Sequence, residues 1–242
     1  MTSALFSITV RALLNRRRTL LLALVGVLLV VVAALFRLSG PGDDEANRFA
    51  LRLLGNFGLG VVLPLVAVIV GTAALGSELD DGTIVYLLAK PVARWRIIAV
   101  KLLVTWLVTS LLVVPAVFVA GLVTNGDATL ALGFAVAALI GGLEYAAIFL
   151  ALSLITSRAL IIGLAYVVVW EGVVAGLFEA TRSFSVRQHA LAVADALGGE
   201  GANGVGDLGI GFALAVTAVV TALAIALAIR RLEEVELRGE TA

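Results

Sequence analysis

The sequence predicts an all-α integral membrane protein with six transmembrane helices, and three observations support this prediction. Of the 242 residues, 62% are hydrophobic and only 14% are charged, whereas a soluble domain would carry roughly a quarter charged residues. The mean hydropathy is +1.14. Apolar segments near the ~20 residues that cross a bilayer core recur along the chain. We therefore expect residues 1–242 to form a single transmembrane domain.

Residues 1–18 precede the first apolar segment and are expected to form an interfacial helix. Several apolar residues lie there, and the stretch ends in three arginines at positions 16–18, which suit lipid headgroups. A signal peptide is the competing interpretation. However, the apolar run from Thr19 to Leu35 is longer than the ~7–15 residues of a signal-peptide core, and no small-residue cleavage site follows it. We therefore expect a retained first span at about residues 19–36.

Five further apolar segments complete the predicted set of spans. They lie at about residues 57–76, 98–123, 130–155, 159–178 and 208–229. Pro64 lies within the second segment and Pro115 within the outer half of the third. An even number of spans places both termini on the same side of the membrane.

Lysine and arginine residues indicate which side that is, because short cytoplasmic loops carry an excess of them. With a cytoplasmic N-terminus, 12 of the 17 basic residues would lie inside, namely Arg11, Arg16, Arg17, Arg18, Lys90, Arg94, Arg96, Lys101, Arg158, Arg230, Arg231 and Arg238. The outside set is Arg37, Arg48, Arg52, Arg182 and Arg187. The sequence therefore predicts a multi-pass protein of the cytoplasmic membrane with both termini in the cytoplasm.

The longest outer segment, residues 179–207, contains one predicted helix. Ser185 to Leu197 has apolar residues at helical spacing, followed by a glycine-rich link. We expect a short amphipathic helix that lies on the outer surface or dips into the membrane edge. His189 is expected on its polar face, without a functional role.

The composition excludes several functions. There are no cysteines, and the single histidine rules out a histidine-rich metal site and a Ser–His–Asp set. No phosphate loop of the form G-x-x-x-x-G-K-[ST] occurs, and no cytoplasmic segment is long enough for an ATPase domain. The net charge is zero, which gives no indication of a nucleic-acid partner. We therefore expect no enzyme activity, no metal and no cofactor in this chain.

The loop at residues 77–97, between the second and third spans, predicts a short helix with two marked ends. Asp80 and Asp81 are placed as N-cap and first-turn acid, because a helix N-terminus has unpaired N–H groups and partial positive charge. Gly82 and Thr83 allow a sharp change of direction there. The chain then presents one apolar face, formed by Ile84, Leu87 and Leu88.

The end of this predicted helix is equally distinct. Lys90 suits the negative end of the helix dipole, and Pro91 stops the helix because the residue before proline resists the αR conformation. Arg94, Trp95 and Arg96 follow, a basic and aromatic group typical of a membrane surface. The loop is either an ordinary charged connection or a small capped helix with a docking role.

The pattern G-x-E-L-D-D-G-T-x-x-x-L-L-A-K-P-V-x-R-W-R-x-x-x-x-K, from Gly76 to Lys101, favours the second interpretation. It resembles the loop after the second span in permease subunits of type-2 ABC exporters, particularly the small six-span kind. In that family the loop carries a coupling helix that docks on a separate cytoplasmic ATPase. The detailed match covers about 25 residues, and the span arrangement extends it over the whole chain.

This resemblance implies a transport complex. It would contain two permeases, as a homodimer or with a paralogue, and two ATPase subunits that hold ATP and Mg²⁺ and drive export of a cargo. It implies an elbow helix at residues 1–18. The residues that it assigns to ATPase coupling are Glu78, Asp80, Asp81, Gly82, Thr83, Ile84, Leu87, Leu88, Lys90, Pro91 and Arg94.

Two carboxylates inside predicted spans are candidates for the pathway. Glu144 and Glu171 lie on antiparallel helices, each about 18 Å from the short turn that joins them. Ionisable groups at this depth usually face a bundle interior, a partner or a cavity. We expect them to line the pathway. The alternative is that each pairs with a hydroxyl group, or is protonated, in a packed interface.

Two other classes of function compete with the ABC permease. One is a proton- or cation-coupled secondary transporter that uses Glu144 and Glu171, and the other is a membrane scaffold that transports nothing. A secondary transporter would be expected to show an inverted three-plus-three repeat or helices broken at the midplane. The sequence shows no convincing repeat of this kind, which favours the ABC permease.

Overall fold

The computed structural model describes residues 16–80, 93–175 and 179–239. The regular structure in these residues is helical throughout. The elements are α2 (Arg16–Leu38), α3 (Asp43–Arg52), the π-helix η1 (Leu53–Val62), α4 (Leu63–Asp80), α6 (Arg94–Asn125), α7 (Ala128–Ile155), α8 (Ala159–Ala165), the π-helix η2 (Tyr166–Val174), α10 (Glu179–Arg182), α11 (Val186–Leu197), the 3₁₀ helix η3 (Glu200–Ala202) and α12 (Ile210–Gly239).

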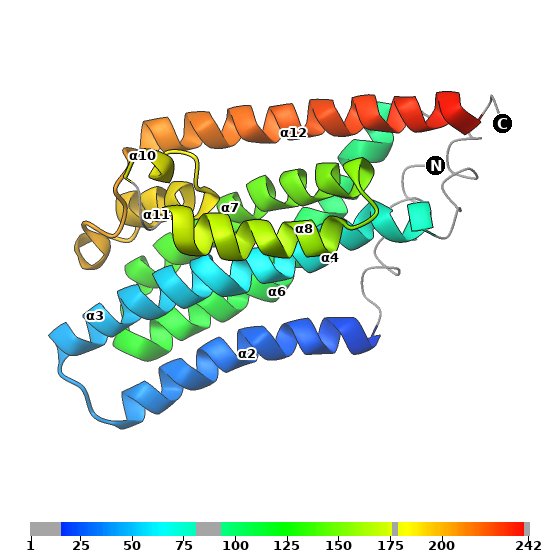
Figure 1. Ribbon diagram of the computed structural model, residues 1–242. Helices are drawn as coiled ribbons and strands as arrows, with labels where there is room; N and C mark the ends of the chain where they lie inside the picture. The colour runs from blue at the N-terminus through cyan, green and yellow to red at the C-terminus, as the bar shows by residue number, and fades with distance from the viewer. Residues whose placement is uncertain (1–15, 81–92, 176–178, 240–242) are drawn as a thin grey trace.

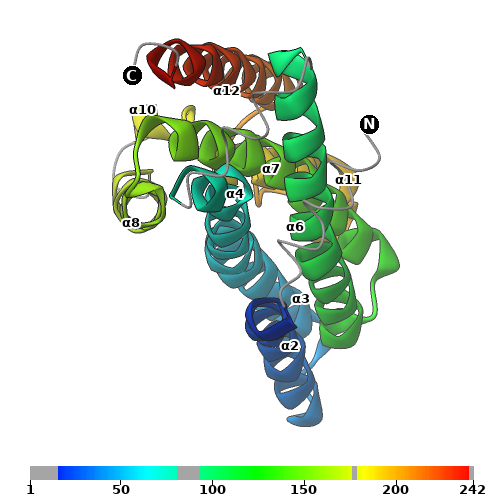
Figure 2. The same cartoon turned by 90° about the vertical axis from the view of Figure 1, so that its right-hand side faces the viewer.

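Helix α7 forms the centre of the bundle and packs against α4, α6, α8, α11 and α12 (Figure 1). Viewed along the bundle, α2 and α12 lie on opposite flanks (Figure 2). Both helices expose many large apolar side chains. Such apolar surface on helices of membrane-spanning length suits contact with lipid. The starts of α2, α6 and α8 lie at the same end as the ends of α4, α7 and α12 (Figure 1). We call this the terminal end, and the other the α11 end.

Glycines allow the closest contacts with α7 and its neighbours. A Cβ atom on Gly163 of α8 would lie 2.4 Å from a methyl group of Val68 in α4. A Cβ on Gly133 of α7 would lie 2.5 Å from Gly198, just after α11. Small residues let membrane helices approach in this way. Helix α11 can therefore lie directly against α7.

Five described helices are long and apolar enough to cross a membrane: Leu20–Leu38, Asp43–Gly76, Arg94–Asn125, Ala128–Ile155 and Ile210–Glu234. They coincide with five of the six predicted spans. The segment predicted to span at residues 159–178 forms a shorter apolar helix, Ala159–Val174. The chain is thus a multi-pass all-α membrane protein, and the sixth span stays a prediction.

The second predicted span begins earlier than residue 57. Residues 43–56, which lie in the stretch between the first two predicted spans, continue the helix as α3 and the start of η1. Asp43, Asp44 and Glu45 occupy the first turn of α3, where acidic groups suit the helix dipole. The side chain of Asn47 also donates a hydrogen bond to the Gly201 carbonyl at 3.0 Å. Charged residues therefore extend this helix beyond its most apolar part.

The predicted interfacial and coupling helices lie mostly outside the described residues. Positions 1–15 and 81–92 are not described, and the latter include most of the predicted coupling residues. Positions 16–18 belong to α2, the helix that continues into the first span, and not to a separate interfacial helix. Asp80 is the last described residue of α4 and lies in that helix, so it is not the N-cap of a new one. Arg94 is the first residue of α6.

Candidate functional site

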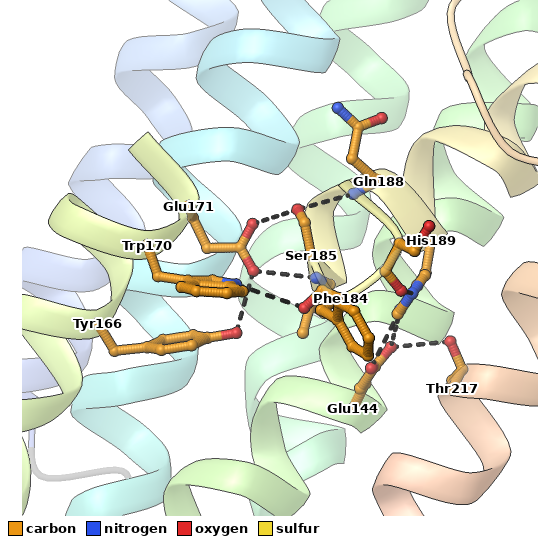
Figure 3. Close-up of polar contacts among 11 residues, drawn as sticks. Glu144, Tyr166, Trp170, Glu171, Phe184, Ser185, Gln188, His189 and Thr217 are labelled. Atoms are coloured by element: carbon orange, nitrogen blue, oxygen red, sulfur yellow. Dashed lines mark hydrogen bonds and ion pairs between the residues drawn. The ribbon is translucent and has the colours of Figure 1, made fainter. Parts of the chain in front are cut away.

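Glu144 of α7 and Glu171 of η2 are both buried, with exposed fractions of 0% and 2%. Figure 3 shows that both carboxylates face the segment that contains α11 and the turn before it. A buried charge is unfavourable unless it is paired and hydrogen-bonded. The partners of these two groups therefore define the site.

Glu144 contacts α11 and α12. Nδ1 of His189 lies 3.2 Å from each carboxylate oxygen, and the hydroxyl group of Thr217 donates a hydrogen bond of 2.8 Å to Oε2. The other ring nitrogen of His189, Nε2, lies 3.0 Å from the carbonyl oxygen of Ser183. One carboxylate thus joins α7 to two other elements.

The protonation of this pair follows from its contacts. The Ser183 carbonyl can only accept, so Nε2 carries a proton. Nδ1 and the Glu144 carboxyl group then share one further proton, because two acceptors at 3.2 Å would repel. Burial disfavours the charged ring, but the hydrogen bond and negative charge of Glu144 outweigh it and raise the pKa of His189 above its usual value. The pair has no net charge in either arrangement.

Glu171 caps the N-terminus of α11. Its oxygens accept hydrogen bonds from the Ser185 hydroxyl at 2.5 Å, the Val186 backbone N–H at 2.9 Å and the Tyr166 hydroxyl at 3.2 Å. Ser185 in turn accepts a bond from the Gln188 N–H at 3.2 Å, the usual role of an N-cap serine. An anion at this position also suits the helix dipole.

Two further contacts hold the start of this segment. The indole N–H of Trp170 lies 3.4 Å from the carbonyl oxygen of Phe184, in the turn before α11. Nε of Arg187 donates to the Gly55 carbonyl of η1 at 3.2 Å, and its guanidinium group also contacts the side chain of Asn56. Both π-helices therefore hold α11, and π-helical segments are frequent at functional sites.

Helix α11 enters the bundle instead of lying on its surface. His189 meets α7 at Glu144, whereas Gly198 meets it at Gly133, 11 residues nearer the α11 end and about 16 Å along the helix. The predicted helix boundaries, Ser185 to Leu197, agree with the observed N-cap and helix. Of its two predicted positions, the one on the outer surface is wrong, because most of its side chains are buried against α7 and α12.

The structure also corrects the expectation for His189. Its exposed fraction is 1%, and it contacts Glu144 instead of lying on a polar face. The sequence held one signal of this: the five residues that follow His189 are all apolar, which leaves little room for a solvated face.

Glu144 and Glu171 belong to one cluster but do not pair with each other among the described contacts. Each accepts a hydroxyl hydrogen bond, from Thr217 and Ser185 respectively. The alternative of hydroxyl pairing in a packed interface therefore describes their contacts.

Within the described part of the chain, the buried hydroxyls of Thr105 and Thr109 on α6 have no hydrogen-bond partner.

The fold and this cluster define a multi-pass helical membrane protein with a polar centre. Residues 14–181 match the family described as ABC-2 family transporter protein. This match covers more than half of the chain, which therefore belongs to that family and is a membrane permease component of an ABC transporter. No curated protein matches the sequence.

The family match confirms the resemblance to type-2 ABC permeases. The matched residues include the loop at 77–97 and both carboxylates. They end before Ser185, His189 and Thr217, so the partners of the carboxylates on α11 and α12 lie outside the match. The family consists of membrane components that are not themselves ATPases and that typically work with an ATPase subunit.

Proposed function

We propose that the chain is the permease subunit of an ABC exporter, which moves a cargo across the cytoplasmic membrane with ATP hydrolysed on separate subunits. Two permeases, identical or paralogous, would assemble with two ATPases that hold ATP and Mg²⁺. The family match supports the class, and the loop pattern at residues 77–97 supports the coupling.

The helices on either side of the loop are joined just before and after it. The side chain of Lys101 on α6 is buried, and its ammonium group donates a hydrogen bond of 2.9 Å to the Ala74 carbonyl of α4. A force on the loop would therefore act on α4 and α6 together. Rigid-body movement of packed helices is a common way to switch between two arrangements.

Helix α11 is the element that such a movement would have to release. It lies between α7, η2 and α12, and its polar contacts with α7 and η2 are made at Glu144 and Glu171. A cargo that leaves at the α11 end would pass this helix. The proposed role of the two carboxylates is to border the pathway, where they favour cationic or hydrogen-bond-donating cargo.

The coupling is tested by co-expressing the chain with an ABC ATPase and measuring co-purification and ATP hydrolysis. Leu87→Asp and Gly82→Pro should each abolish ATPase binding, while Leu87→Met should behave as the wild type. A charge at Leu87 would be desolvated in the contact, which costs several kcal/mol, and proline lacks the conformational freedom of Gly82. Normal binding by both variants, with normal membrane insertion, would contradict the docking role.

The buried Glu144–His189 pair is the observation that keeps a second candidate, a proton-coupled transporter. Purified chain in liposomes that contain a pH-sensitive dye distinguishes the two. A permease that depends on its ATPase should show no proton flux of its own. Proton flux by the chain alone, lost in Glu144→Gln, would instead support the second candidate.

A further inference from the structure

A groove of about 330 Å³ lies between α7 and α12 on the terminal-end side of the carboxylate cluster. All of its lining side chains are apolar. They include Ile148, Leu152 and Ile155 of α7 and Leu223, Ala224 and Leu227 of α12. On each helix they recur at three- and four-residue spacing, so that each contributes one continuous face.

The position of the groove follows from the Glu144–Thr217 hydrogen bond. Ile155 lies 11 residues after Glu144, and Leu227 lies ten residues after Thr217, so both are about 15 Å nearer the terminal end. Figure 1 shows α7 and α12 side by side over this distance, and Figure 2 shows α8 on the other side of α7 from α12. The groove therefore lies within the span-length apolar parts of both helices, near their terminal end, which corresponds to the hydrocarbon of one leaflet if both helices cross the membrane.

Arginines lie just beyond the groove, in the chain after each of the two helix faces that line it. Arg158 is exposed in the turn after α7, and Arg230 and Arg231 are exposed one turn after Leu227 on α12. The nearby carboxylates on α12 are Glu233 and Glu234, both exposed, and Glu234 pairs with Arg231 at 2.7 Å. Such an exposed pair is weak. The described charged groups beyond this end of the groove therefore have a net positive charge.

An apolar groove at hydrocarbon depth, with guanidinium groups at the level of the headgroups, matches one ligand chemistry. Acyl chains suit the walls, and arginine binds phosphate through parallel hydrogen bonds. Basic sites between transmembrane helices on the cytoplasmic side are known to bind anionic headgroups. We propose that this groove binds an anionic phospholipid, with an acyl chain between α7 and α12 and the phosphate at Arg158 and Arg230. This site does not depend on the proposed transport function.

The test measures lipid binding to the purified full-length chain in non-ionic detergent by native mass spectrometry. Phosphatidylglycerol and phosphatidylcholine with identical acyl chains are the probes, and glycerol 3-phosphate represents the headgroup alone. Phosphatidylglycerol should bind more tightly than phosphatidylcholine by about fivefold for each arginine that contacts it. Glycerol 3-phosphate should not compete, because the acyl chain supplies most of the contact.

Variants separate the two parts of the site. Arg158→Gln and Arg230→Gln should each weaken the binding of phosphatidylglycerol by about fivefold and leave the binding of phosphatidylcholine unchanged. Ala224→Phe should weaken the binding of both lipids, because the larger side chain would fill the groove. The matched control is Ala222→Phe, since Ala222 is exposed on the same helix but does not line the groove. Arg37→Gln, at the opposite end of the bundle, should have no effect.

Three results would overturn the proposal. Equal binding of the two phospholipids would show that the site does not recognise the anionic headgroup. Wild-type binding by Ala224→Phe would place the lipid elsewhere. Loss of a dimer in Ala224→Phe, with lipid binding unchanged, would show that a second copy of the chain occupies the groove instead.

Discussion

The contact between α7 and α12 differs sharply between its two halves. Towards the α11 end, Glu144 and Thr217 are hydrogen-bonded in a buried site that also includes His189. Towards the terminal end, the same two helices line an apolar groove. Hydrogen bonds in a low-dielectric interior are directional and unfavourable to leave unmade, whereas apolar contacts tolerate sliding. One half of the interface is therefore fixed, and the other can adjust.

The largest effect is expected from breaking the fixed half. Glu144→Leu leaves His189 and Thr217 buried without their acceptor, and loss of one partner of a buried charged pair typically costs about 3–5 kcal/mol. Denaturant unfolding in detergent should show this loss. Glu144→Gln keeps the shape and an acceptor oxygen, so a smaller loss is expected. Equal stability of the leucine variant and the wild type would show that the cluster does not hold α11.

A smaller effect is expected at the other attachment of α11. Ser185→Ala removes the N-cap that accepts from Gln188 and donates to Glu171, and loss of such a cap costs about 1 kcal/mol. Hydrogen exchange of the first α11 amides should become faster, while exchange in α7 stays unchanged. Thr129→Ala is a matched control, because Thr129 lies in the first turn of α7 with an exposed side chain. Uniformly faster exchange would indicate global destabilisation instead.

The smallest effect on stability is expected from a change of pH, because no side chain is removed. The pKa of His189 is raised in the folded protein, since the hydrogen bond and charge of Glu144 outweigh burial. Its contribution to stability is therefore complete below the unfolded value of about 6.5 and is lost as pH rises through the folded pKa. Unfolding measured across this range should show stability falling with pH, and His189→Gln should remove that component. An unchanged pH profile in this variant would contradict the contact between His189 and Glu144 as the cause of the raised pKa.

Much of the fold could be predicted from hydropathy, because a run of about 20 apolar residues has few other stable environments. Five predicted spans correspond to long helices. Boundaries were harder, because helix formation continues through charged residues such as Asp43 and Glu45, which hydropathy assigns to a loop. The outer helix was predicted with nearly correct ends, since Ser185 and the glycine-rich link mark them.

The candidate site could be predicted only in part. Glu144 and Glu171 were identifiable because carboxylates are rare within apolar spans. Their partners were not, because Ser185 and His189 belong to a segment whose insertion depends on tertiary packing. Thr217 is a further case, since a hydroxyl in a membrane helix usually bonds its own backbone, as Thr72 does with the Val68 carbonyl. Nothing in the sequence distinguishes these two threonines.

The neutral His189–Glu144 pair also determines how α11 would respond to voltage. With one proton shared, the pair carries no net charge, so the membrane potential does no net work on it while the contact holds. Separating an imidazolium from a carboxylate would instead move charge through the field, at about 2.3 kcal/mol per charge for each 100 mV crossed. Separation as two neutral groups, with the shared proton on Glu144, would avoid this term. The pair itself would then add no voltage dependence to the release of α11.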